Sequence, residues 1–191
     1  MIYQIIEDSQ LAKRNQSLVL GCGGTIAYNA VLSTVFSGES TTEPVTLDEA
    51  KNWCRIDVTD DDTLIEDIII PAAREVCENY ANLSFIARTV TAKIQNGLGN
   101  FYLPYGPVVA ITAATDYNLN NIFTDFSLDT VYPQPITVVY TAGYADGTLP
   151  KNLKTAVLCQ IAWIYENRGD LTVGPGVSDL SKLLLNQVRN V

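Results

Sequence analysis

The stretch 43–85 constrains the fold of this chain most, because it carries two consecutive helical patterns separated by acidic residues. In the first pattern Thr46 precedes apolar residues at helical spacing, and Glu49 follows three positions later, which is the arrangement of a capping box. In the second pattern apolar residues recur three and four positions apart and form a broad face. These residues are Leu64, Ile65, Ile68, Ile69, Ala72, Ala73, Val76 and Tyr80. The stretch therefore predicts a pair of helices.

The residues between the two helical patterns are strongly acidic. They include Asp57 and the consecutive aspartates Asp60, Asp61 and Asp62, and Glu66 follows shortly after. Short carboxylate side chains accept hydrogen bonds from the free amides of a new helix, and their charge suits its positive end. We therefore interpret the three aspartates mainly as helix caps. A hard cation is the alternative, although the glycine and the spacing of a calcium loop are absent.

Pro71 lies inside the second helical pattern. A proline at this position removes the amide that would bond the carbonyl of Asp67, and its ring crowds that carbonyl. We therefore expect a kink or a short break in the helix.

The rest of the chain predicts a β region and two more helices. Alternation of apolar and polar residues over 89–95 and 136–140 predicts strands. A widely apolar, and therefore central, helix is predicted from about Pro150 to Gly169. A last short helix places its apolar residues on one stripe: Leu180, Leu183, Leu184 and Val188. The predicted fold class is α+β, a mainly helical domain (helical pair, central helix, short C-terminal helix) with an inserted antiparallel β region.

We assign residues 43–191 to this domain and residues 1–42 to an N-terminal extension, an arm followed by a linker. In the extension Gly21–Gly24 follows an apolar run, but the third glycine and the βαβ context of a dinucleotide loop are absent. A tight turn between two strands, or an ordering arm, explains these glycines. A soluble ligand-binding or regulatory module that uses this loop is the alternative function. The uncharged run 18–36 is diluted by glycines and polar side chains and barely reaches the ~20 residues of a membrane span, so we expect no membrane association.

Composition excludes several classes of chemistry. The net charge of -9 opposes tight sequence-independent DNA binding, which needs clustered Lys and Arg, but not a wall past which DNA slides. The absence of histidine excludes Ser-His-Asp and Cys-His nucleophiles and histidine metal sites. The four widely spaced cysteines predict buried free thiols in a reducing compartment. No motif with a catalytic mechanism is left, so we expect no enzyme and no cofactor or metal.

Several segments resemble one family. The sequence EPVTLDEAKNWCRID (43–57), with the acidic turn and long helix that follow, is similar to the opening of the head–tail connector (adaptor) proteins of tailed bacteriophages. Later segments are similar to corner, strand-end, helix-end and C-terminal motifs of that family: LPYGPV (103–108), VVYTAGY (138–144), YENR (165–168) and LLNQVR (184–189). In the last motif Gln187 replaces the usual proline. The resemblance covers about residues 43–191.

The resemblance implies a structural virion protein in the neck, at the head–tail junction, made in the host cytoplasm. It implies a homo-oligomeric ring of about twelve copies, following the cyclic symmetry of the portal protein. Such a ring lies between the portal and the tail or a stopper (head-completion) protein and extends the DNA channel. Double-stranded DNA passes through it during packaging and ejection without sequence-specific binding.

Two groups of residues are candidate sites. The first is an acidic cluster that carries more charge than one helix cap needs, and we expect it to line the lumen or to contact a neighbouring subunit: Asp57, Asp60, Asp61, Asp62 and Glu66. The second is a tail that docks in the portal or another partner: Leu180, Leu183, Leu184, Val188 and Arg189. The alternative is that the apolar stripe of this tail folds back on the core of its own chain.

Overall fold

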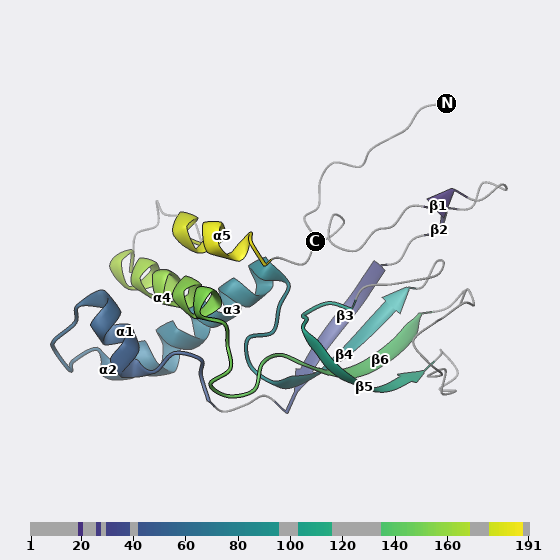
Figure 1. Cartoon of the computed structure of the whole chain (residues 1–191), viewed down its shortest axis with the longest axis horizontal. Helices are drawn as coiled ribbons and strands as arrows, with labels where there is room; N and C mark the ends of the chain where they lie inside the picture. The colour runs from purple at the N-terminus through teal and green to yellow at the C-terminus, as the bar shows by residue number, and fades with distance from the viewer. Residues whose placement is uncertain are drawn as a thin grey trace.

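The computed structural model describes residues 19–20, 26–27, 30–38, 42–95, 103–115, 135–168 and 176–188. Its helices are α1 (Leu47–Cys54), α2 (Asp62–Leu64), the π-helix η1 (Ile65–Ile69), α3 (Ile70–Ala81), α4 (Lys151–Glu166) and α5 (Asp179–Leu185). Its strands are β1 (Val19–Leu20), β2 (Ile26–Ala27), β3 (Ala30–Ser37), β4 (Arg88–Gln95), β5 (Val108–Thr115) and β6 (Ile136–Ala142). The predicted α+β class is confirmed, and Figure 1 shows the helices gathered at one end and the four-stranded sheet at the other.

The helices pack around α4, as its wide apolar surface predicts. Helix α4 contacts α1, η1, α3 and α5, and Figure 1 shows it between α5 and the other helices. Its buried residues Leu153, Ala156, Val157 and Ile161 belong to the same hydrophobic cluster as Ile70, Ala73 and Cys77. Cys77 and Cys159 are buried free thiols and Cys54 is a half-buried one, while Cys22 lies outside the described residues. Burial raises the pKa of the Cys77 thiol to about 12, which makes it unreactive.

The capping box of the helical pair is confirmed, whereas the second helix shows no break at Pro71 and runs on from α2 through η1 into α3. The Thr46 hydroxyl accepts a hydrogen bond from the Glu49 amide, and the Glu49 carboxylate accepts one from the Thr46 amide, which completes the capping box at the start of α1. In place of the expected break, the π-helix η1 ends immediately before α3, which has Pro71 in its first turn. Proline has no N–H to donate to the helix, and the wider π turn just before it tolerates this missing hydrogen bond.

The sheet has the strand order β3-β4-β6-β5, and every neighbouring pair is antiparallel. Its edge strand β3 comes from the segment that the sequence assigns to the extension 1–42, so that segment contributes to the sheet. The domain boundary at residue 42 stays a prediction. Strands β1 and β2 form a separate antiparallel pair on either side of residues 21–25, in agreement with the predicted strand–turn–strand, and Gly21–Gly24 themselves lie outside the described residues.

The position directly after β6 requires a glycine, and Gly143 occupies it. Its φ is +103°, and a Cβ atom built on it would lie 2.0 Å from the carbonyl oxygen of Ile86. Its amide donates a 3.0 Å hydrogen bond to the carbonyl of Pro107. A side chain at this position would clash with backbone atoms, which cannot move aside as a flexible side chain can. Only glycine therefore lets these strand ends approach one another.

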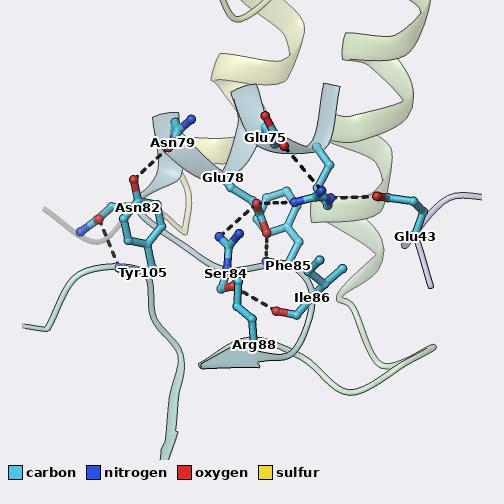
Figure 2. A network of polar contacts seen from close by, with 11 residues as sticks. Glu43, Glu75, Glu78, Asn79, Asn82, Ser84, Phe85, Ile86, Arg88 and Tyr105 are labelled. Carbon is cyan, nitrogen blue, oxygen red and sulfur yellow. Dashed lines mark hydrogen bonds and ion pairs between the residues drawn. The ribbon is translucent and has the colours of Figure 1, made fainter. Parts of the chain in front are cut away.

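A buried ionic network joins the helices to the sheet (Figure 2). The Glu78 carboxylate on α3 accepts hydrogen bonds from Arg74 Nη1 at 2.8 Å, from Arg88 Nη2 at 3.1 Å and from the Phe85 amide at 2.5 Å. Arg74 Nε also donates to Glu43 at 2.9 Å. Burial raises the pKa of the Glu78 carboxyl, and the charges of Arg88 and Arg74 oppose that shift. The network links α3, the first residue of β4 and the segment that precedes α1.

We predict that Glu78→Gln lowers the free energy of unfolding by about 3–5 kcal/mol, because it leaves two buried guanidinium groups without their shared counter-charge. The matched control is Glu75→Gln, the same substitution at another glutamate of α3. The Glu75 side chain is 64% exposed and lies 3.9 Å from Arg74. The control should change the free energy by no more than about 0.5 kcal/mol. Urea unfolding of both variants measures the difference, and equal losses would contradict a special role for Glu78.

Candidate functional site

The structure divides the predicted acidic cluster into two parts with different surroundings. Asp61 and Asp62 are half-buried and form ion pairs with other helices, whereas Asp57, Asp60 and Glu66 are exposed. Among the described residues, none of the last three has a side-chain hydrogen bond or an ion pair. The first part therefore fixes the position of the turn, and the second part presents charge to the surroundings.

The prediction that these aspartates cap the second helix with their side chains is wrong. Asp61 is the N-cap residue of α2, but no side-chain capping bond is present. The φ and ψ of Asp61 are -97° and 3°, whereas a capping side chain needs an extended N-cap residue. The Asp61 backbone carbonyl accepts from the Ile65 amide at 2.9 Å, and its carboxylate is directed to another helix.

Tyr165 and Arg168, at the C-terminal end of α4, hold that carboxylate. Asp61 Oδ2 accepts hydrogen bonds from the Tyr165 hydroxyl at 2.7 Å and from Arg168 Nη1 at 3.1 Å. The Arg168 guanidinium also lies over the Tyr165 ring, 4.0 Å from its centroid. The hydrogen bond from Tyr165, followed by that from Arg168, lowers the pKa of the Asp61 carboxyl. The YENR segment thus anchors the acidic turn to α4.

Sequence reasoning missed this anchor, although a signal for it exists. Tyr165 lies in the last turn of α4 and Arg168 three residues later, just beyond the helix end, a spacing that brings the two side chains together. Their partner, however, lies more than a hundred residues earlier in the chain, and spacing within one helix does not identify it.

Two further ion pairs hold α1 in place. Lys51 Nζ on α1 donates to Asp62 Oδ1 at 2.5 Å, across the acidic turn. Lys154 Nζ on α4 donates to Glu49 Oε1 at 2.6 Å, so the capping residue of α1 is also tied to the central helix. The turn between α1 and η1 is therefore fixed from both α1 and α4.

The C-terminal helix α5 is folded back on the core of its own chain. Ser178 caps it by accepting from the Ser181 amide at 3.2 Å, and the Ser181 hydroxyl donates to the carbonyl of Ala156 on α4 at 2.9 Å. Leu185 is fully buried in the helical core, although it is not in the predicted stripe.

The predicted apolar stripe is split by this packing. Leu184 and Val188 are half-buried against the helical core. Leu180 and Leu183 are 55% and 63% exposed and remain available to another molecule. Arg189 lies outside the described residues. The docking role of the tail stays a prediction.

One cavity among the described residues is small for a ligand site. The cavity between Glu43, Phe85, Tyr144 and Lys154 has a volume of about 200 Å³, below the ~300–1,000 Å³ of usual ligand pockets. No group of three or more cysteine or carboxylate side chains among the described residues is placed to hold a metal ion. Within the same residues, no helix combines the length and hydrophobicity of a bilayer span.

Comparison with protein families gives a match. The model of a family described as "Phage gp6-like head-tail connector protein" matches residues 44–174, which is more than half of the 191-residue chain. No curated protein sequence matches the chain significantly.

Three solved structures with a similar fold come from gene transfer agent (GTA) particles. A chain from "Virion of native gene transfer agent (GTA) particle" has a TM-score of 0.61 and 18% identity, and the match covers 84% of this chain and 96% of that one. A chain from "Neck of empty GTA particle computed with C6 symmetry" has a TM-score of 0.61 and 19% identity, with the same coverages. A chain from "Neck of native GTA particle computed with C12 symmetry" has a TM-score of 0.58 and 19% identity, and covers 82% and 96%.

The Asp61 anchor predicts a pH-dependent stability difference. Because its pKa is lowered in the folded state, ionised Asp61 stabilises the protein above its unfolded pKa, and this contribution is lost as the pH falls through the folded pKa. Asp61→Asn should therefore be less stable than wild type at neutral pH, and the gap should close as the pH falls below about 4. Thermal unfolding across pH measures the gap.

The control for this prediction is Asp60→Asn, the neighbouring exposed residue. This variant should follow the wild-type curve at every pH. A difference between wild type and Asp61→Asn that stays constant through acid pH would contradict the ionic anchor.

Proposed function

The chain belongs to the phage gp6-like head-tail connector family, and from that premise we propose that it is one subunit of a ring in a virion neck. The ring lies between the portal and the tail or a stopper protein and extends the channel through which DNA is packaged and ejected. The observation that carries this proposal is the family match over 44–174, on a described fold that resembles chains of GTA particles and necks. Membership in a head-tail connector family supports a structural role for the chain.

We propose about twelve copies for the ring. The similar neck structures were computed with C6 and C12 symmetry, and a ring of about twelve copies is compatible with both. A ring of identical subunits needs a heterologous contact, in which two different surfaces of the chain meet. The assembled ring is located at the head–tail junction of the particle, after synthesis in the host cytoplasm.

The exposed carboxylates are proposed to act by repulsion and by pairing. Asp57, Asp60 and Glu66 are unpaired among the described residues, on a turn whose position is fixed by Asp61 and Asp62. Such fixed negative charges repel phosphates where they line the lumen, and attract a cationic side chain where they meet a neighbouring subunit. The net charge of -9 agrees with a channel that passes double-stranded DNA without binding it.

The tail is proposed to dock in a partner of the ring, with the portal as the first candidate. Leu184, Val188 and the buried Leu185 attach α5 to its own core, so the helix is already ordered before a partner binds. The exposed Leu180 and Leu183 are then the residues that enter an apolar groove, and Arg189 follows them in the chain.

The purified protein should form rings, alone or when it is mixed with portal rings. Negative-stain electron microscopy shows the rings, and analytical ultracentrifugation gives the copy number. The proposal fails if the protein stays monomeric at high concentration and also ignores the portal.

The combined variant Asp57→Lys, Asp60→Lys and Glu66→Lys should impair the neck in one of two measurable ways. If the carboxylates meet a neighbour, fewer rings form; if they line the lumen, rings form but the assembled necks retain DNA during ejection. The control carries the same change of charge at exposed carboxylates elsewhere: Asp48→Lys, Glu75→Lys and Glu166→Lys. Unchanged assembly, retention and ejection in the first variant would exclude both roles.

A further inference from the structure

One face of the four-stranded sheet is buried and the other is accessible. In the ladders, residues paired across strands share a face. The buried face consists of residues that are at most 1% exposed: Val90, Ala92, Ile94, Ile136, Val138 and Tyr140. The opposite face, here called the outer face, is made of three cross-strand rows: Val35-Thr91-Val139-Ala113, Ser33-Lys93-Thr137-Thr115 and Ser37-Thr89-Thr141-Ala110. Each of these residues is exposed or half-buried.

The outer face differs in charge from the chain as a whole. The chain holds 21 acidic residues against 12 basic ones, yet the three rows contain no carboxylate and a single cation, the exposed Lys93. The remaining side chains of the rows are small or β-branched and neutral, and Val35 is 61% exposed at the edge strand β3. A neutral surface of small side chains is suited to close packing against another protein surface and lacks the clustered cations that bind DNA.

The helical end of the molecule has the complementary properties. Trp53, at the end of α1, and Val58, in the acidic turn, are exposed apolar side chains. They lie within a few residues of Asp57 and Asp60, two exposed carboxylates that have no ion pair among the described residues. Figure 1 shows the turn between α1 and α2 at one end of the fold and the sheet at the other.

We propose that the outer face of the sheet is the docking surface for a second copy of this chain, which contacts it with the end of its helical pair. Trp53 and Val58 of one copy pack on the neutral rows of the next, and Lys93 pairs with Asp57 or Asp60. Because the two surfaces lie at different ends of the fold, the contact is heterologous and repeats from copy to copy until the ring closes. This inference rests on the proposed ring and names its two contact surfaces.

The test compares ring assembly of wild type with variants at the centre of the outer face. Lys93→Glu places like charges together and should raise the concentration at which half of the protein is in rings by about tenfold or more. Val35→Asp should act in the same direction. Because Lys93 and Val35 are exposed, both variants should fold like wild type. The circular dichroism spectrum and melting temperature of the unassembled protein verify this. Lys151→Glu, an equal charge change at an exposed lysine at the start of α4, is the matched control and should leave assembly unchanged.

Restored assembly in the double variants Lys93→Glu/Asp57→Lys or Lys93→Glu/Asp60→Lys identifies the partner surface. A loss that neither double variant repairs would overturn the assignment of the helical end as the occupant. Rings that form equally well in wild type, Lys93→Glu and Val35→Asp would overturn the outer face as the contact while leaving the ring itself intact. Failure of the wild-type protein to form any ring is a different result, because it contradicts the proposed function.

Discussion

The ionic network centred on Glu78 is the interaction on which the relative placement of helices and sheet depends. The helices and the sheet have separate hydrophobic clusters, so apolar packing alone does not join them. Glu78 connects Arg74 on its own helix with Arg88 at the start of β4, and the Arg88 guanidinium also lies 3.9 Å from the ring centroid of Phe36 on β3. Buried charges of this kind are tolerated only where their partners are in place. This requirement restricts the helices and the sheet to few relative positions.

The same reasoning extends to the acidic turn at the far end of the helices. Here the anchor is Asp61, which Tyr165 and Arg168 hold from the end of the central helix, and Lys51 adds a second contact through Asp62. These side chains are partly exposed, so each pair contributes little to stability by itself. Their effect is geometric, because they fix the direction in which the unpaired carboxylates of the turn point. A connector that contacts its neighbours through both ends depends on such fixed geometry.

Local signals in the sequence predicted local structure well. The capping box of Thr46, an irregularity of the helix near Pro71 and the central position of α4 each follow from residues within a turn or two of one another. The anchor of Asp61 and the strand β3 did not follow, because each depends on a partner far away in the chain. The run 18–36 in particular holds no charge and little alternation, so nothing in it identified 30–37 as the edge of a sheet.

The candidate tail shows a second reason why sequence alone did not predict the site: helical periodicity can be ambiguous. Leu183, Leu184 and Leu185 are consecutive, so helical periodicity does not determine which of them faces the core. Packing decides in favour of Leu185, since the buried Ser181 lies one turn before it and bonds α4. The predicted stripe therefore contained two residues that pack on the core and two that do not.

The negative charge of the chain limits which of its surfaces can contact one another in an assembly. Copies that each carry a net charge of -9 repel one another, but at physiological salt this repulsion falls off within about 8 Å. Distant carboxylates therefore matter little, and the charges directly at the contact decide whether two copies associate. A contact between two acidic surfaces is unfavourable, whereas a face without carboxylates and with one lysine accepts an acidic surface without such a penalty. A strongly acidic chain can therefore form a closed ring and still present negative charge to DNA, provided that its contact surfaces differ in charge from the rest.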